Sequence, residues 1–118
     1  SAEMTGKETR KALTRAYKEV KPEAGIYAVR CAATGAVFVG PSRNIARQQT
    51  SLWFSLRSGS FPNPALQNLW RAEGEAAFAF EPLEVFPPEE LTPYLLEAKL
   101  KERLKHWRAA LAAATVSG

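Results

Sequence analysis

Glutamate, arginine and tyrosine are the residues of this chain best suited to chemistry. All twelve acidic residues are glutamates, so a metal ion held by carboxylates would have to use glutamate. Cys31 is the single cysteine and His106 the single histidine. Their number excludes, within these residues, an intramolecular disulfide, a cysteine-rich metal site and a histidine cluster for zinc.

Positive charge is concentrated in the first half of the chain. Residues 1–59 carry ten lysines and arginines against four glutamates, whereas residues 60–118 carry six against eight. A basic half suggests phosphate or another polyanion as a partner. We therefore treat three arginines as candidate nucleic-acid contacts, namely Arg43, Arg47 and Arg57. The alternative is that all three are ordinary solvated surface charges.

Hydrophobic spacing and turn residues predict the elements that would position these side chains. Residues 25–40 form two apolar runs around a Gly-containing turn, which is typical of a β-hairpin. The same patterns predict helices over about 7–20, 42–57, 63–74 and from Glu89 or Pro93 to Ala113, a third strand over 77–83, and a loose tail from Thr115. We expect one α/β (α+β) domain over residues 1–118, with its core at about 25–107. Its sheet should be small, three-stranded and largely antiparallel, flanked by helices.

Two further expectations concern surface and location. Trp53 lies in the apolar stripe of the helix over 42–57, so we expect it in the core, whereas Phe54 lies off that stripe. An exposed Phe54 would mark a contact surface for a partner protein or nucleic acid. We expect Cys31 to be a buried strand thiol. No run of 18 apolar residues occurs, so the sequence predicts no membrane span, and we expect a cytoplasmic protein.

The predicted hairpin carries two tripeptides, Gly25-Ile26-Tyr27 and, ten residues later, Phe38-Val39-Gly40. This pattern resembles the GIY-YIG nuclease superfamily, which is named for its two tripeptides. The resemblance continues downstream to the last helix and covers roughly two-thirds of the chain. It is carried there by Asn44-Ile45, Leu56-Arg57-Ser58-Gly59, Asn63, Leu66-Gln67, Trp70, Gly74, Phe78 to Glu84, and Glu97.

The resemblance implies hydrolysis of a phosphodiester with one divalent metal ion, Mg²⁺ or Mn²⁺, bound by Glu97. It puts Tyr27 at the first motif tyrosine, Phe38 at the second, and Gln48 where the family has a phosphate-neutralising arginine. The catalytic candidates are thus Tyr27, Gln48 and Glu97, although Phe38 has no hydroxyl and Gln48 brings no charge. Leu52 stands where many members place a histidine. A simpler interpretation of the helix residues is that Glu97 pairs with Lys101 one turn later and that Gln48 belongs to a polar seam.

Three hypotheses about function follow. The leading one is a nuclease-like domain that binds nucleic acid, DNA ahead of RNA, with weak or lost hydrolysis. The second is an active metal-dependent endonuclease that uses Tyr27 and Glu97 with Arg43 or Arg47 as the cation. The third is a protein-interaction domain whose old cleft is filled by Leu52 and Phe38.

Overall fold

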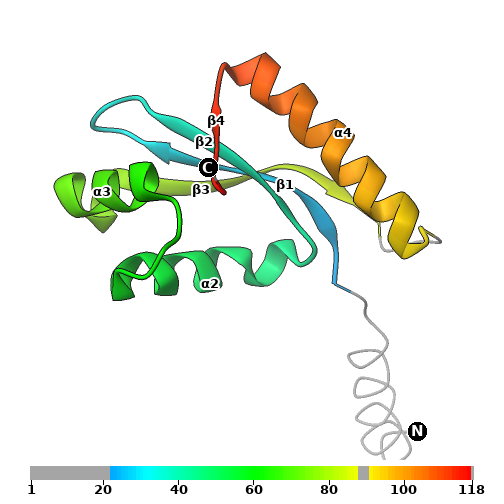
Figure 1. The fold of residues 1–118 in the computed structure, drawn as a ribbon, viewed down its shortest axis with the longest axis horizontal. Helices are drawn as coiled ribbons and strands as arrows, with labels where there is room; N and C mark the ends of the chain where they lie inside the picture. Colours follow the sequence, from blue (N-terminus) through cyan, green and yellow to red (C-terminus); the bar gives the residue numbers. More distant parts are fainter. Residues whose placement is uncertain (1–21, 88–90, 118) are drawn as a thin grey trace, which may run out of the picture.

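The computed structural model describes residues 22–87 and 91–117, and the helix expected over 7–20 lies outside them. Three helices and a four-stranded sheet make up the described part (Figure 1). In chain order the elements are β1 Ala24–Cys31, β2 Val37–Ser42, α2 Ile45–Ser58, α3 Pro64–Glu73, a 3-10 turn Glu75–Ala77, β3 Phe78–Phe86, α4 Pro93–Leu111 and β4 Ala114–Thr115. The α+β class expected from the sequence is confirmed.

The sheet has the strand order β3-β1-β2-β4, so β1 and β2 occupy its centre. β1 pairs antiparallel with β2 and with β3, as expected, but β4 adds a parallel partner to β2. The prediction of three strands and a loose tail is therefore wrong at Thr115 and Val116. β4 is only two residues long, which is too short for an alternating pattern to reveal it.

Long-range contacts hold β4 in place. The Val116 amide donates to the Val39 carbonyl at 2.8 Å, and the Val116 side chain is buried. Asn63 donates from Nδ2 to the main-chain oxygens of Thr115 and Val116, at 3.2 and 3.0 Å. The same side chain caps α3 by accepting from the Ala65 amide at 3.0 Å. One buried asparagine thus joins the start of α3 to the last strand.

The predicted hairpin is confirmed, and two glycines explain how β1 meets its neighbours. Gly35 has φ 76°, a left-handed conformation that suits the connection between β1 and β2. Gly25 has another role, because a Cβ there would lie 2.0 Å from the Glu84 carbonyl oxygen on β3. β1 and β3 approach each other too closely at this point for any side chain.

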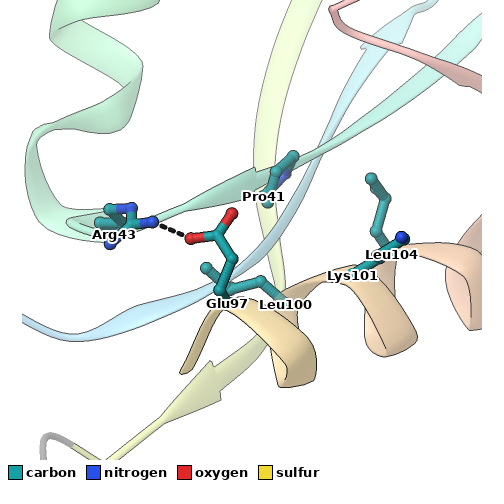
Figure 2. A pocket seen from close by; sticks show the side chains of 6 residues that line it. All are labelled: Pro41, Arg43, Glu97, Leu100, Lys101 and Leu104. Carbon is teal, nitrogen blue, oxygen red and sulfur yellow. Dashed lines mark hydrogen bonds and ion pairs between the residues drawn. The ribbon is translucent and has the colours of Figure 1, made fainter. Parts of the chain in front are cut away.

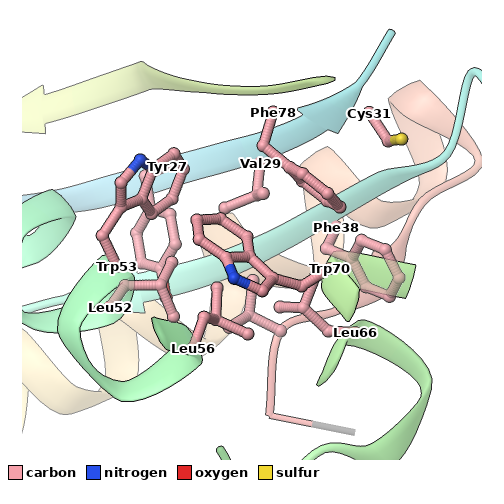
Figure 3. Packing of buried hydrophobic residues seen from close by; sticks show 11 residues of the cluster. Tyr27, Val29, Cys31, Phe38, Leu52, Trp53, Leu56, Leu66, Trp70 and Phe78 are labelled. Atoms are coloured by element: carbon pink, nitrogen blue, oxygen red, sulfur yellow. The ribbon is translucent and has the colours of Figure 1, made fainter. Parts of the chain in front are cut away.

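Helices cover both faces of the sheet (Figure 1). α2 and α3 pack on one face, where an apolar cluster includes Val29, Trp53, Leu66 and Trp70 (Figure 3). α4 packs on the other face, against a smaller cluster with Ile26, Phe86 and Leu100 and Leu104 and Trp107 at its margin. The sheet is therefore the middle of three layers.

Element boundaries agree with the expected ones only in part. Pro41 and Ser42 belong to β2, so α2 begins only at Ile45, with Asn44 as its N-cap residue. α4 begins at Pro93, the later of the two expected starts, and Thr92 caps it by accepting from the Leu95 amide at 3.2 Å. β3 runs three residues further than predicted, to Phe86.

The expectations for Cys31 on β1 and Trp53 on α2 are confirmed. Cys31 and Trp53 are buried, whereas Phe54 is 70% exposed on the outer side of α2. None of the helices in the described part of the chain is both long and apolar enough to cross a membrane.

Candidate functional site

A shallow pocket lies between the end of β2, the turn into α2, and α4 (Figure 2). Its volume is about 280 Å³. Three of its lining residues are charged and three are apolar: Arg43, Glu97, Lys101, Pro41, Leu100 and Leu104. The pocket brings the end of the β1–β2 hairpin next to Glu97, which lies more than fifty residues later in the sequence.

Hydrogen bonds fix the wall of the pocket that carries Arg43. The Ser42 hydroxyl accepts from the Asn44 amide at 3.1 Å, and the Ile45 amide donates to the Glu23 carbonyl at 2.9 Å. These bonds set the turn between β2 and α2, and Arg43 projects from it. The arginine is therefore positioned by the backbone on both sides.

The α4 wall is anchored to β3 by side chains that sequence reasoning did not single out. The Glu84 carboxylate accepts from Arg103 Nε at 2.8 Å and from Trp107 Nε1 at 2.9 Å. Burial alone would raise the pKa of Glu84, but these two hydrogen bonds and the nearby charges of Arg103 and Lys99 lower it below its usual value. Lys99 Nζ also lies 4.5 Å from the centroid of the Phe86 ring. No local pattern signals this anchor, because β3 and α4 meet only in the folded chain.

Glu97 pairs with Arg43 rather than with Lys101 (Figure 2). The ion pair joins Arg43 Nη2 to Glu97 Oε2, and the two side chains are 62% and 64% exposed. The expected helix pair between Glu97 and Lys101 does not form within 4 Å among the described residues. With two cations and one carboxylate, the lining of the pocket carries one net positive charge.

Tyr27 is not part of this pocket. It lies in the cluster between the sheet and α2, 3% exposed, with its ring stacked on Phe80 at 5.0 Å between centroids. Its hydroxyl lies over Gly40, where a Cβ would come within 2.7 Å of Oη. Burial raises the pKa of Tyr27 to about 12, so the phenol is protonated at neutral pH. Glu97 lies on α4, which covers one face of the sheet, whereas the Tyr27 side chain lies on the opposite face, where α2 packs.

The other positions carried over from the family lie on the Tyr27 side. Phe38 and Leu52 are buried in the same apolar cluster, 7% and 3% exposed (Figure 3). The Leu52 side chain packs in the core and lines no open groove on α2. Gln48 is half-buried on α2, and within the described residues its side chain makes no hydrogen bond. Neither residue adds a charge near Tyr27.

The remaining arginine candidates are separate from the pocket. Arg57 pairs with Glu75 through two hydrogen bonds, Nε to Oε1 at 2.6 Å and Nη2 to Oε2 at 2.8 Å. That pairing raises the pKa of Arg57 and lowers the pKa of Glu75. Arg47 is exposed on α2 and has no partner among residues 22–87 and 91–117. In the same part of the chain, no three Glu, Cys or His side chains gather as a metal site.

Comparison with solved structures identifies the fold. The chain is similar to the catalytic domain of the intron endonuclease I-TevI as its E75A mutant, with a TM-score of 0.64 and 22% identity over 76% of this chain and 84% of that one. It is also similar to a structure of the catalytic domain of homing endonuclease I-TevI, with a TM-score of 0.63 and 22% identity over 75% and 88% of the two chains.

No protein-family model matches the chain, and no curated protein matches it. The assignment therefore rests on structural similarity, which at 22% identity shows the fold alone. The I-TevI catalytic domain is a GIY-YIG nuclease. This chain accordingly has a GIY-YIG-like α+β fold.

Proposed function

We propose that this domain binds nucleic acid, DNA first among the ligands to test, and hydrolyses it weakly or not at all. The fold similarity to an endonuclease catalytic domain supports nucleic acid as the ligand class. The observation that carries the proposal is the Arg43–Glu97 ion pair in a pocket that also contains Lys101. A pocket with net positive charge suits a phosphate group.

The same pocket does not fit the divalent metal ion that the family resemblance implies. Mg²⁺ and Mn²⁺ prefer oxygen ligands, and Glu97 is the single carboxylate of the lining. Arg43 is bonded to that carboxylate, and Lys101 adds a second positive charge. A divalent cation would have to displace the guanidinium and then lie beside two cations, so the lining favours an anion.

The other positions carried over from the family also argue against efficient hydrolysis. Phe38 and Gln48 supply neither a hydroxyl nor a cation to orient water or to neutralise a phosphodiester in its transition state. Tyr27 is buried with its hydroxyl over Gly40, and the raised pKa removes its ionised form even further from neutral pH, so the phenol is a poor acceptor of a proton from water. Three of the expected catalytic functions thus lack a suitable group.

Binding and cleavage should be measured side by side. Fluorescence anisotropy with labelled single-stranded and duplex DNA and RNA, at salt from about 50 to 200 mM, measures affinity and its salt dependence. Incubation with supercoiled plasmid, with Mg²⁺ and Mn²⁺ in separate reactions, measures cleavage. We expect binding that weakens steeply with salt and no nicking above the protein-free control.

The alternatives predict different results in the same experiment. Cleavage by the wild type that vanishes in a folded Glu97→Ala variant would establish an active endonuclease and refute the proposal. No binding to any of the four nucleic acids at the lowest salt would also refute it and would favour the protein-interaction hypothesis. Binding without cleavage would support it.

A further inference from the structure

A row of cations runs along the exposed flank of α4, starting at the pocket. The helix carries five lysines and arginines. Two of them, Lys99 and Arg103, are engaged with Phe86 and Glu84 on β3. The other three are Lys101, Lys105 and Arg108, and within the described residues none of them has an ion-pair partner.

These three residues form one stripe, which we call the α4 stripe. Their spacing of four and three residues puts them within about 60° around the helix, and seven residues span about 10 Å along its axis. Lys101 and Lys105 are exposed, and so is Arg108. That length matches the rise of about three nucleotides along one strand of B-DNA.

Few carboxylates lie near the α4 stripe, so its positive charge is largely uncompensated. Glu97 precedes it on the same face, but its charge is matched by Arg43. Glu102 is the other carboxylate of α4, and it lies roughly 60–120° to one side of the three stripe residues. Like charges one turn apart repel each other on a helix, so an anionic ligand would relieve an unfavourable interaction already present in the fold.

The surface beside the end of the α4 stripe is also hollowed. A second shallow depression of about 310 Å³ is lined by Lys105 and Arg108 together with Ala109, Ala112 and Ala113. Its lining has two cations and no carboxylate. The small alanine side chains would let a phosphate backbone come close to the helix. The stripe therefore links two shallow pockets along a single helix.

We propose that the α4 stripe binds the phosphodiester backbone of nucleic acid, continuing from the pocket at Arg43. This inference rests on the proposed function and adds the location and extent of the interface. Its three cations would engage about three phosphates, independently of base sequence, because contacts to phosphate carry no sequence information. α2 offers less, because Arg57 is paired with Glu75 and leaves Arg47 as its one unpaired cation among the described residues.

The test is a set of single neutralising substitutions, Lys101→Gln, Lys105→Gln and Arg108→Gln, and the triple variant. Glutamine is a good helix former, so the variants should keep the circular dichroism spectrum and urea midpoint of the wild type. Each single variant should weaken binding to a short labelled duplex roughly five- to tenfold at 0.1 M salt. The slope of log K against log salt should become shallower by about 1 for each cation removed.

Two comparison variants make the result specific. Arg71→Gln removes an exposed cation from α3, which lies apart from α4 (Figure 1), and should leave affinity unchanged. Arg47→Gln tests the rival surface on α2. The losses in the stripe variants should be equal for two duplexes of unrelated sequence.

Three outcomes would overturn the inference. Unchanged affinity and salt slope in the triple variant would show that the α4 stripe does not bind nucleic acid, while leaving the proposed function standing. A loss in Arg47→Gln with none in the stripe variants would move the interface to α2. Absence of wild-type binding at low salt would refute the inference together with the proposed function.

Discussion

Replacing Glu97 by glutamine separates an anion-binding pocket from a metal site. Glu97→Gln keeps the shape of the side chain, frees Arg43 and changes the net charge of the pocket lining from one to two positive charges. The ion pair is mostly solvent-exposed, so its loss should change the free energy of unfolding by only about 0–1 kcal/mol. The freed guanidinium adds one phosphate contact. Each such contact changes log K by about 0.9 per decade of salt, so binding should tighten roughly five- to tenfold at 0.1 M salt.

The assay is fluorescence anisotropy with a labelled duplex over a salt series, without divalent metal and with Mg²⁺. Glu102→Gln is the matched control, because it removes the same charge from α4 outside the pocket. We expect the gain and a salt slope steeper by about 1 in Glu97→Gln, and a smaller gain in the control. Weaker binding in Glu97→Gln, or affinity that needs Mg²⁺ in the wild type and loses that need in the variant, would show that Glu97 holds a metal ion and refute the reasoning.

Three further predictions concern the fold that carries the site. The raised pKa of Tyr27 should make the free energy of unfolding fall by up to about 1.4 kcal/mol per pH unit between about pH 10 and 12, because the unfolded phenol ionises first. Urea titrations across this range should show that slope in the wild type and lose it in Tyr27→Phe. Asn63→Ala should destabilise the protein by about 2–4 kcal/mol in urea unfolding, since it removes the α3 cap and two bonds to β4, whereas exposed Asn68→Ala should change little. Gly25→Ala should abolish folding as judged by circular dichroism, because its Cβ would meet backbone, whereas Gly40→Ala meets a side chain and should cost only about 1–3 kcal/mol.

The elements nearest the hairpin could be predicted from sequence because their signals are local. Gly35 supplies the positive φ between two β-branched runs, Asn63 and Pro64 mark the start of α3, and Gly59 and Gly74 end α2 and α3. These effects act within a few residues of backbone. They were enough to predict the α+β class. The two tripeptides can be read directly from the sequence, and they carry the resemblance that the structural comparison supports at the level of the fold.

Contacts between segments that are distant in the sequence could not be predicted in this way. β4 was missed because two residues carry no pattern, and it forms only where Asn63 and Val39 offer bonding partners. Sequence spacing paired Glu97 with Lys101 on one helix, whereas the fold brings Arg43 to it from fifty-four residues away. Such pairs depend on which side chains of different elements come within bonding distance in the folded chain, and a short stretch of sequence does not contain that information.

The sequence by itself determined the motif positions and their chemical losses, namely Phe38 without a hydroxyl and Gln48 without a charge. Tertiary structure decided what surrounds the groups that remain. Packing of α2 on the sheet buried Tyr27 and raised its pKa, and packing of α4 on the opposite face joined Glu97 to Arg43. The reason is that residue type fixes what a side chain can do, whereas its charge state and its partner depend on burial and on neighbours that only the folded chain supplies.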